Sequence, residues 1–230
     1  MSDPAPDELA ALREQRRRSL DRALSFSDAV MSIALTLLVL PLVDIATDNP
    51  NESILDQLDR SGPQVLGFLV SFLVISQFWG AHRRLWDQLA DYDERLLTIN
   101  TLWLLLVVFL PYPTARLFAE DATHPDSAIF YLLVLFGVSS LMLAEAWYVA
   151  RHPWLRRSGD RRWMRDQILP SVGTTATFAL AILLALINRN AGLYSLLLLV
   201  VVQRFTTQKD RPIGQPRPDR HPLPRKNRLP

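Results

Sequence analysis

The chain has 230 residues, 49% of them hydrophobic, with 25 Lys and Arg against 23 Asp and Glu and a net charge of +2. The charges gather in short blocks separated by long uncharged runs, which excludes an ordinary soluble protein, because soluble helices alternate apolar and polar faces. The chain has no cysteine, which excludes a disulfide framework and a thiolate metal site.

Residues 1–21 begin acidic and become basic only later, which is not the order of a secretory signal peptide. The run Arg16 to Arg18 resembles a twin-arginine signal, but further apolar segments follow the first one. We therefore expect residues 1–21 to be a cytoplasmic N-terminal segment rather than a cleaved leader.

Apolar segments fill most of the remaining chain, and several approach the roughly 20 residues that a helix needs to cross a bilayer core of ~30 Å. They are continuous runs rather than ten-residue alternations, so helices are expected and a barrel is not. Trp86, Trp154 and Trp163 lie near the expected interfaces with water. The six predicted spans are 22–44, 63–83, 95–116, 127–150, 167–188 and 190–206.

The loops between these spans differ in basic charge. All but three of the 25 Lys and Arg fall before the first span, after the second, after the fourth or after the last. The positive-inside rule then places both termini in the cytoplasm. The sequence predicts an all-α integral membrane protein with six transmembrane helices over residues 22–207, followed by a disordered, basic, Pro-rich cytoplasmic tail over 208–230.

When the first span is placed on a helix, its side chains form one apolar stripe and, beside it, one polar stripe. An Asp inside a membrane helix is costly, and it is a functional-site candidate by default. In one interpretation both stripes are packing, and the polar groups bond neighbouring helices. In the other, the apolar stripe lines a pore and the polar stripe fixes the rotation of the helix against its neighbours. The apolar stripe is Phe26, Val30, Ile33, Leu37, Leu40 and Asp44, and the polar stripe is Ser25, Asp28, Ser32 and Thr36.

Polar side chains in the next two spans offer partners for the first. Trp79 and His82 lie near the end of the second span, and Asn100 lies in the third. Each needs a hydrogen-bond partner inside or at the edge of a bilayer. The sequence contains no cluster typical of a metal site, no nucleophile–base pair and no phosphate loop, so we expect neither an enzyme, a cofactor, a bound metal nor a nucleic-acid partner.

The spacing Arg22-x3-Phe26-Ser27-Asp28 resembles the RxxxFSD signature of the transmembrane protein 175 family of cation channels. The similarity covers roughly residues 16–120. Other positions that fit the family's first three helices are Ile33, Thr36, Leu37, Leu40, Trp79, His82, Asn100 and the run LPYPT at 110–114.

This resemblance implies a potassium-permeable channel with Ile33 as its narrowest apolar ring, Leu37 and Leu40 as further rings, and Thr36 near the constriction. It also implies a single-repeat homotetramer in the lipid bilayer of a prokaryotic plasma membrane, which passes monovalent cations and needs no cofactor beyond the permeant K⁺. The residues implied to anchor the pore helix are Arg22, Phe26, Ser27, Asp28, Ser32, Trp79, His82 and Asn100.

Three other functions stay open at this stage. A proton-conducting channel of the same topology would use Asp28. A secondary transporter usually has broken helices at the membrane midplane, whereas Pro41 and Pro111 lie near the ends of the predicted spans. A non-transporting scaffold would tolerate polar substitutions in the first span.

Overall fold

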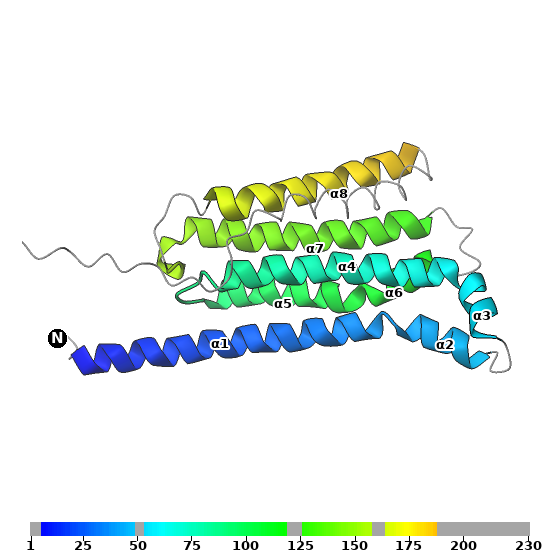
Figure 1. Cartoon of the computed structure of the whole chain (residues 1–230). Coiled ribbons are helices and arrows are strands. Elements are labelled where there is room, and N and C mark those ends of the chain that lie inside the picture. The colour runs from blue at the N-terminus through cyan, green and yellow to red at the C-terminus, as the bar shows by residue number, and fades with distance from the viewer. Residues whose placement is uncertain (1–5, 49–52, 119–125, 158–163, 188–230) are drawn as a thin grey trace, which may run out of the picture.

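The computed structural model describes residues 6–48, 53–118, 126–157 and 164–187, and these are almost entirely helical (Figure 1). The predicted sixth span, 190–206, and the predicted disordered tail, 208–230, lie outside the described residues. The helices are α1 (Pro6–Leu37), α2 (Leu40–Asp48), α3 (Ile54–Arg60), α4 (Gly62–Trp86), α5 (Glu94–Phe109), α6 (Pro111–Leu117), α7 (Asp126–Arg151) and α8 (Leu169–Ile187), with the short turns η1 (Pro153–Leu155) and η2 (Met164–Ile168).

Five helical stretches in the described residues are long and apolar enough to cross a membrane. They correspond to the first five predicted spans, so the predicted all-α membrane fold is confirmed for this part of the chain. The described residues contain no strand, only an isolated bridge between Leu89 and Arg156. The five stretches are Glu14–Ile45, Gly62–Trp86, Glu94–Leu117, Asp126–Arg151 and Asp166–Ile187.

The first span differs from the predicted helix at both ends. Helix α1 already begins at Pro6, so the predicted N-terminal segment continues directly into the span. Near the other end the chain turns at Leu38 and Val39, and α2 begins at Leu40. Pro41 explains this turn, because it has no N–H to donate to the carbonyl of Leu37.

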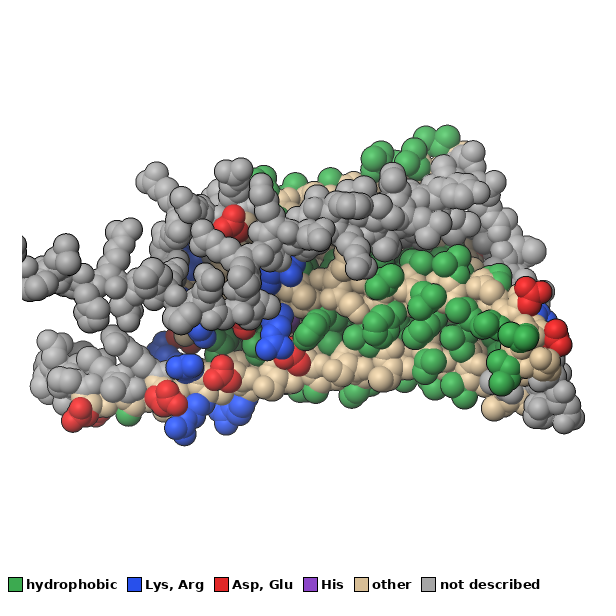
Figure 2. All heavy atoms as spheres, in the orientation of Figure 1, with side chains coloured by type: hydrophobic (Ala, Val, Ile, Leu, Met, Phe, Trp, Pro, Cys, Tyr) green, Lys and Arg blue, Asp and Glu red, His purple; other side chains and the backbone are tan. Residues whose placement is uncertain are grey.

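The long helices lie side by side with their axes roughly parallel, and α1 and α8 lie at opposite edges (Figure 1). Helix α7 packs against α5, α6 and α8, whereas α1 packs against α4 and α5. Figure 2 shows hydrophobic side chains over the middle of one face and charged side chains toward its ends. A belt of this kind is expected for a bundle whose middle faces lipid.

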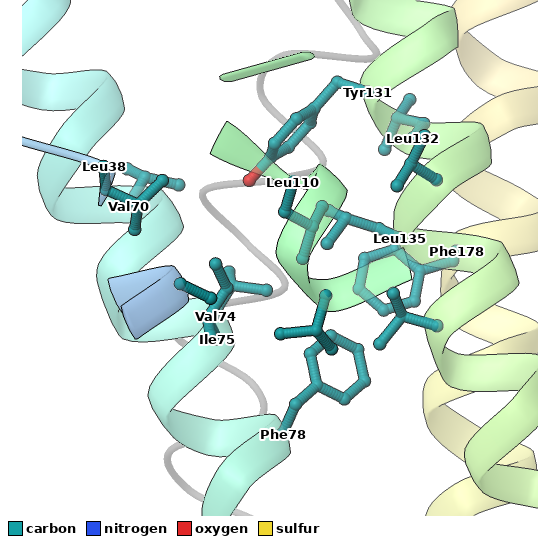
Figure 3. Close-up of a cluster of buried hydrophobic side chains, with 14 of the residues drawn as sticks. Leu38, Val70, Val74, Ile75, Phe78, Leu110, Tyr131, Leu132, Leu135 and Phe178 are labelled. Carbon is teal, nitrogen blue, oxygen red and sulfur yellow. The ribbon is translucent and has the colours of Figure 1, made fainter. Parts of the chain in front are cut away.

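The main hydrophobic core joins α1 and α4 to α5 through α8 (Figure 3). Phe78 of α4 stacks against Phe178 of α8, with 6.0 Å between ring centroids. Gly67 lets the Phe118 ring pack directly against the backbone of α4, because a Cβ at this position would lie 2.2 Å from that ring. The core residues labelled in Figure 3 are Leu38, Val70, Val74, Ile75, Phe78, Leu110, Tyr131, Leu132, Leu135 and Phe178.

A second hydrophobic cluster lies at the end of the bundle where α1 begins, and the loop after α4 meets the loop after α7 there. The Ala90 N–H donates to the Leu155 carbonyl at 2.7 Å, and the Arg157 Nε–H donates to the Leu89 carbonyl at 2.7 Å. These bonds tie the loop after α4 to the loop after α7. The two loops therefore lie at the same end of the bundle, as the predicted topology requires.

Asp93 strengthens this end of the bundle. Its carboxylate caps α5 by accepting the Leu96 N–H at 2.9 Å and also accepts the Tyr148 hydroxyl at 2.5 Å. Burial alone would raise the pKa of Asp93, but the hydrogen bonds from Tyr148 and Leu96 hold it below its usual value.

Candidate pore helix and its anchoring network

Helix α1 buries one face against the bundle and leaves the opposite face uncovered by the described part of the chain. Three large apolar side chains of the span Glu14–Ile45, spaced seven residues apart, are exposed: Phe26 (63%) and Ile33 (57%) on α1, and Leu40 (50%) at the start of α2. Val30 and Leu37 lie beside them and are half-buried. The buried face consists of Leu20, Ser27, Met31, Ala34 and Leu38.

Within the described residues, the hydroxyls of the polar stripe bond their own helix rather than its neighbours. Ser25 donates to the Asp21 carbonyl, Ser32 to the Asp28 carbonyl and Thr36 to the Ile33 carbonyl, each at 2.8 Å. Such bonds to the preceding turn are a local alternative open to Ser and Thr. Within the described part of a single chain, these three hydroxyls therefore form no hydrogen bond that joins α1 to a neighbouring helix, and the anchoring role expected of Ser32 stays a prediction.

Asp28 is the member of the polar stripe that joins α1 to α4. The Trp79 indole Nε1–H donates to Asp28 Oδ1 at 2.7 Å, and Arg83 Nη1 lies 3.5 Å from Asp28 Oδ2. The guanidinium of Arg83 also lies 5.7 Å from the centroid of the Trp79 ring. The carboxylate of Asp28 thus has a neutral donor and a cation on the adjacent helix, which lowers the cost of an acid in a membrane helix.

A second, fully buried connection joins α1 to α5 and α4. Ser27 Oγ donates to the Ala23 carbonyl at 3.1 Å and accepts Asn100 Nδ2–H at 3.0 Å. Asn100 Oδ1 lies 2.8 Å from His82 Nε2. Because Ser27 has used its proton, Asn100 must direct its oxygen at His82, and His82 Nε2 must carry the proton that it donates. The three side chains fix one another's orientation and hold α1 at one rotation.

His82 is also held by two aromatic rings. It stacks on Trp103 with 4.3 Å between centroids and an interplanar angle of 5°, and it lies 5.4 Å from Trp86. Trp86, at the end of α4, is 1% exposed and packs inside the bundle, whereas Trp154 is 55% exposed. Trp163 lies outside the described residues.

Two residues of the signature lie apart from this network. Phe26 is exposed, and Arg22 makes no hydrogen bond or ion pair within the described part of the chain. Their role as anchors stays a prediction, because both side chains are exposed and no anchoring bond is seen for either within the described part of a single chain. Both line an open cavity of about 350 Å³ with Ser19, Ala23, Tyr92, Leu97, Asn100 and Thr101.

Sequence reasoning missed three members of the network: Arg83, Trp103 and Glu145. Glu145 of α7 is fully buried, and its Oε2 accepts the Trp86 Nε1–H at 3.3 Å. The available signal was an acid inside the fourth predicted span. Among the described residues there is no group of three His, Cys, Asp or Glu side chains that could hold a metal ion.

Comparison with known proteins finds similarity to one family. Residues 22–111 match the family model described as the endosomal/lysosomal potassium channel TMEM175. The Homo sapiens endosomal/lysosomal proton channel TMEM175 is 29% identical over 222 residues, which cover 88% of this chain and 42% of that protein. A protein of Streptomyces collinus named a potassium channel is 33% identical over 133 residues, which cover 56% of this chain and 64% of that protein.

A solved structure has the same fold. The crystal structure described as a lysosomal potassium-selective channel TMEM175 homolog from Chamaesiphon minutus superposes with a TM-score of 0.68. The superposition covers 83% of this chain and 99% of that chain at 24% identity. The matches to the human and Streptomyces proteins, by contrast, span only about half of those proteins' lengths, at 42% and 64%.

Proposed function

From its similarity to TMEM175 channel proteins, we propose that this chain is a member of that family and forms a potassium-permeable cation channel whose pore is lined by α1. Potassium channel is the name that the Streptomyces collinus and Chamaesiphon minutus relatives carry. One lining helix cannot enclose a pore. Four copies of the chain around a symmetry axis supply four lining helices, and a closed rotational symmetry is the usual arrangement of identical subunits.

The observation that carries the proposal is the two-sided character of α1. One face is fixed through Ser27 and Asp28 to α4 and α5, while Phe26, Ile33 and Leu40 stand uncovered on the other side. A helix that only packed in its own bundle or faced lipid would not need a buried polar network to set its rotation. A pore helix does need one, because turning the helix by the angle of one residue changes which side chains face the pore axis.

Ile33 is the constriction in this proposal. A ring of aliphatic side chains offers no oxygen atoms to replace the hydration shell of an ion. When the narrow segment loses its water, it therefore blocks the passage of ions. Such a ring favours the cation that sheds water more readily, which is potassium rather than sodium. Leu37 and Leu40 form further apolar rings, and Thr36 lies beside the constriction with its hydroxyl bonded to its own helix.

The proposed setting is a prokaryotic plasma membrane, with the joined loops after α4 and α7, and the arginines in and beside them, in the cytoplasm. The prokaryotic relatives support this setting. Both termini then lie in the cytoplasm, provided that residues 190–206 form the sixth span.

Proton conduction is the second candidate, because relatives from several vertebrates are named proton channels. Asp28 is the group of α1 that suits this activity. It lies within the span and stays half-exposed while bonded to Trp79.

Ion flux into liposomes that contain the purified full chain tests the proposal. We expect potassium uptake that exceeds sodium uptake and does not need a counter-substrate. A proton gradient alone, applied without potassium, provides the control for proton conduction. Proton flux without potassium or sodium flux would favour the second candidate. Flux that saturates and requires a counter-substrate would contradict a channel.

A further inference from the structure

Glu145 is a buried acid that the pore mechanism does not use. It lies on α7, within the membrane span Asp126–Arg151, and its side chain is 0% exposed. A lone ionised carboxylate at such a position is very costly, so it must be neutralised by a proton or by an adjacent cation. Its surroundings show which of these solutions the fold provides.

His82 is the ionisable group that faces Glu145 most closely. His82 Nε2 lies 3.9 Å from Glu145 Oε2, and the His82 side chain is 1% exposed. Three polar atoms around this pair have no hydrogen-bond partner in the described residues: His82 Nδ1, Trp103 Nε1 and Glu145 Oε1. A proton can therefore sit on Glu145 Oε1 or on His82 Nδ1 without breaking any bond of the network.

Among the described residues, the elements packed around the pair bring no further charge into direct contact with it. Asp28 of α1 acts on His82 electrostatically but is itself paired with Arg83 of α4. Helix α5 contributes Asn100 and Trp103, which do not titrate, and described α8 and η1 contain no ionisable side chain. Asp166 of η2 is exposed, and Arg116 of α6 lies beyond Pro111 at the other end of the fifth helix.

These contacts also connect Glu145 to the pore helix. Glu145 holds Trp86, Trp86 stacks on His82, His82 donates to Asn100, and Asn100 donates to Ser27 of α1. We propose that Glu145 is a positioning residue for α1, which shares one proton with His82 and transmits the loss or gain of that proton to the pore helix through Asn100 and Ser27.

The charge states explain the expected response. With one proton between them, the pair is net neutral, either as two neutral groups or as an ion pair. Removing that proton leaves Glu145 as a buried anion beside a neutral His82, and adding a second leaves His82 as a buried cation beside a neutral Glu145. Each state holds one buried charge without a counter-charge. Either change strains the orientation of His82 and hence its bond to Asn100. This inference rests on the proposed channel function only where conduction serves as the readout.

Two variants and one control test the proposal. Glu145→Gln keeps the shape and an oxygen for the Trp86 indole but cannot titrate, whereas Glu145→Leu also removes that oxygen. Ser139→Ala is the matched control, because it removes a buried hydroxyl of α7 that donates only to the Phe136 carbonyl. Potassium flux is measured between about pH 5 and pH 9, a range that extends to both sides of the ordinary histidine pKa.

We expect a pH-dependent step in the flux of the wild-type protein and of Ser139→Ala that is lost in Glu145→Gln. Glu145→Leu is expected to lower flux by roughly tenfold, a typical strength of coupling between distant sites. A step that survives in Glu145→Gln, or a wild-type profile without a step, overturns the proposal.

Infrared spectroscopy of the wild-type protein supplies a readout that does not depend on conduction. We expect a carboxylic-acid C=O band that changes with pH over the same range and is absent from Glu145→Gln. If the wild-type protein conducts no cation, the channel function fails, and this band still decides the present inference. A band of unchanged intensity, or one that persists in Glu145→Gln, contradicts proton sharing.

Discussion

Replacement of Ile33 by asparagine is expected to raise potassium flux and to weaken the preference for potassium over sodium. Asparagine has nearly the length of isoleucine but adds an amide that binds water, so the narrow segment no longer loses its water. An increase on the order of tenfold corresponds to a barrier about 1.4 kcal/mol lower. Flux of both ions into liposomes measures the effect.

The matched control is Leu180→Asn on α8. Leu180 is 54% exposed, against 57% for Ile33, but lies at the opposite edge of the bundle. Its replacement should leave flux and selectivity unchanged if only α1 lines the pore. Unchanged flux in a folded Ile33→Asn protein, or equal effects at both positions, would remove Ile33 from the constriction.

Replacement of Asn100 by alanine is expected to produce the largest loss of stability in the anchoring network. It removes the hydrogen bonds to Ser27 and His82 and leaves the buried His82 Nε2 without its acceptor. Interhelical hydrogen bonds in membranes contribute about 0.6 to 2 kcal/mol each, and an unsatisfied buried group adds a penalty of about 1–3 kcal/mol. We therefore expect a loss of about 2–4 kcal/mol, seen as a lower Tm in detergent.

Thr101→Ala serves as the control for this measurement. Thr101 is the next residue of α5, is exposed, and donates only to the Leu97 carbonyl of its own helix. Its Tm should stay near that of the wild-type protein, and its flux should be retained, whereas Asn100→Ala loses flux because α1 is no longer held at one rotation. Equal Tm values for the two variants would show that the buried network does not stabilise the position of α1.

The spans were predictable from the sequence because a membrane leaves the backbone few options. A long uncharged run has to satisfy its N–H and C=O groups internally, so hydropathy alone predicts a helix. The break between α1 and α2 was also predictable in principle, since Pro41 lacks the N–H that a continuous helix needs. The early start of α1 at Pro6 was not, because nothing in the hydropathy of residues 6–21 distinguishes a helix from a solvated segment.

The site was only partly predictable. The resemblance led to Ser27, Asp28 and Asn100, which the structure brings together with Trp79 and His82. The partners of the Ser32 and Thr36 hydroxyls were not predictable, because a helical wheel does not show whether a hydroxyl bonds its own backbone.

Glu145 was missed for a different physical reason. An acid six residues before the end of a span is easily taken for the edge of that span. Its identity as a buried partner of Trp86 depends on how α7 packs against α4, which no local pattern encodes.

Cysteine accessibility along α1 tests the central claim most directly, and the absence of native cysteine makes it feasible. Single cysteines are placed at Ile33, Thr36 and Leu40 on the uncovered face and at Ala34 and Leu38 on the buried face. A cationic methanethiosulfonate reagent is then applied during potassium flux. The account predicts block at the first three positions and none at the last two. Flux that is insensitive to modification at Ile33, Thr36 and Leu40, or that is blocked equally at all five positions, would contradict a pore lined by α1.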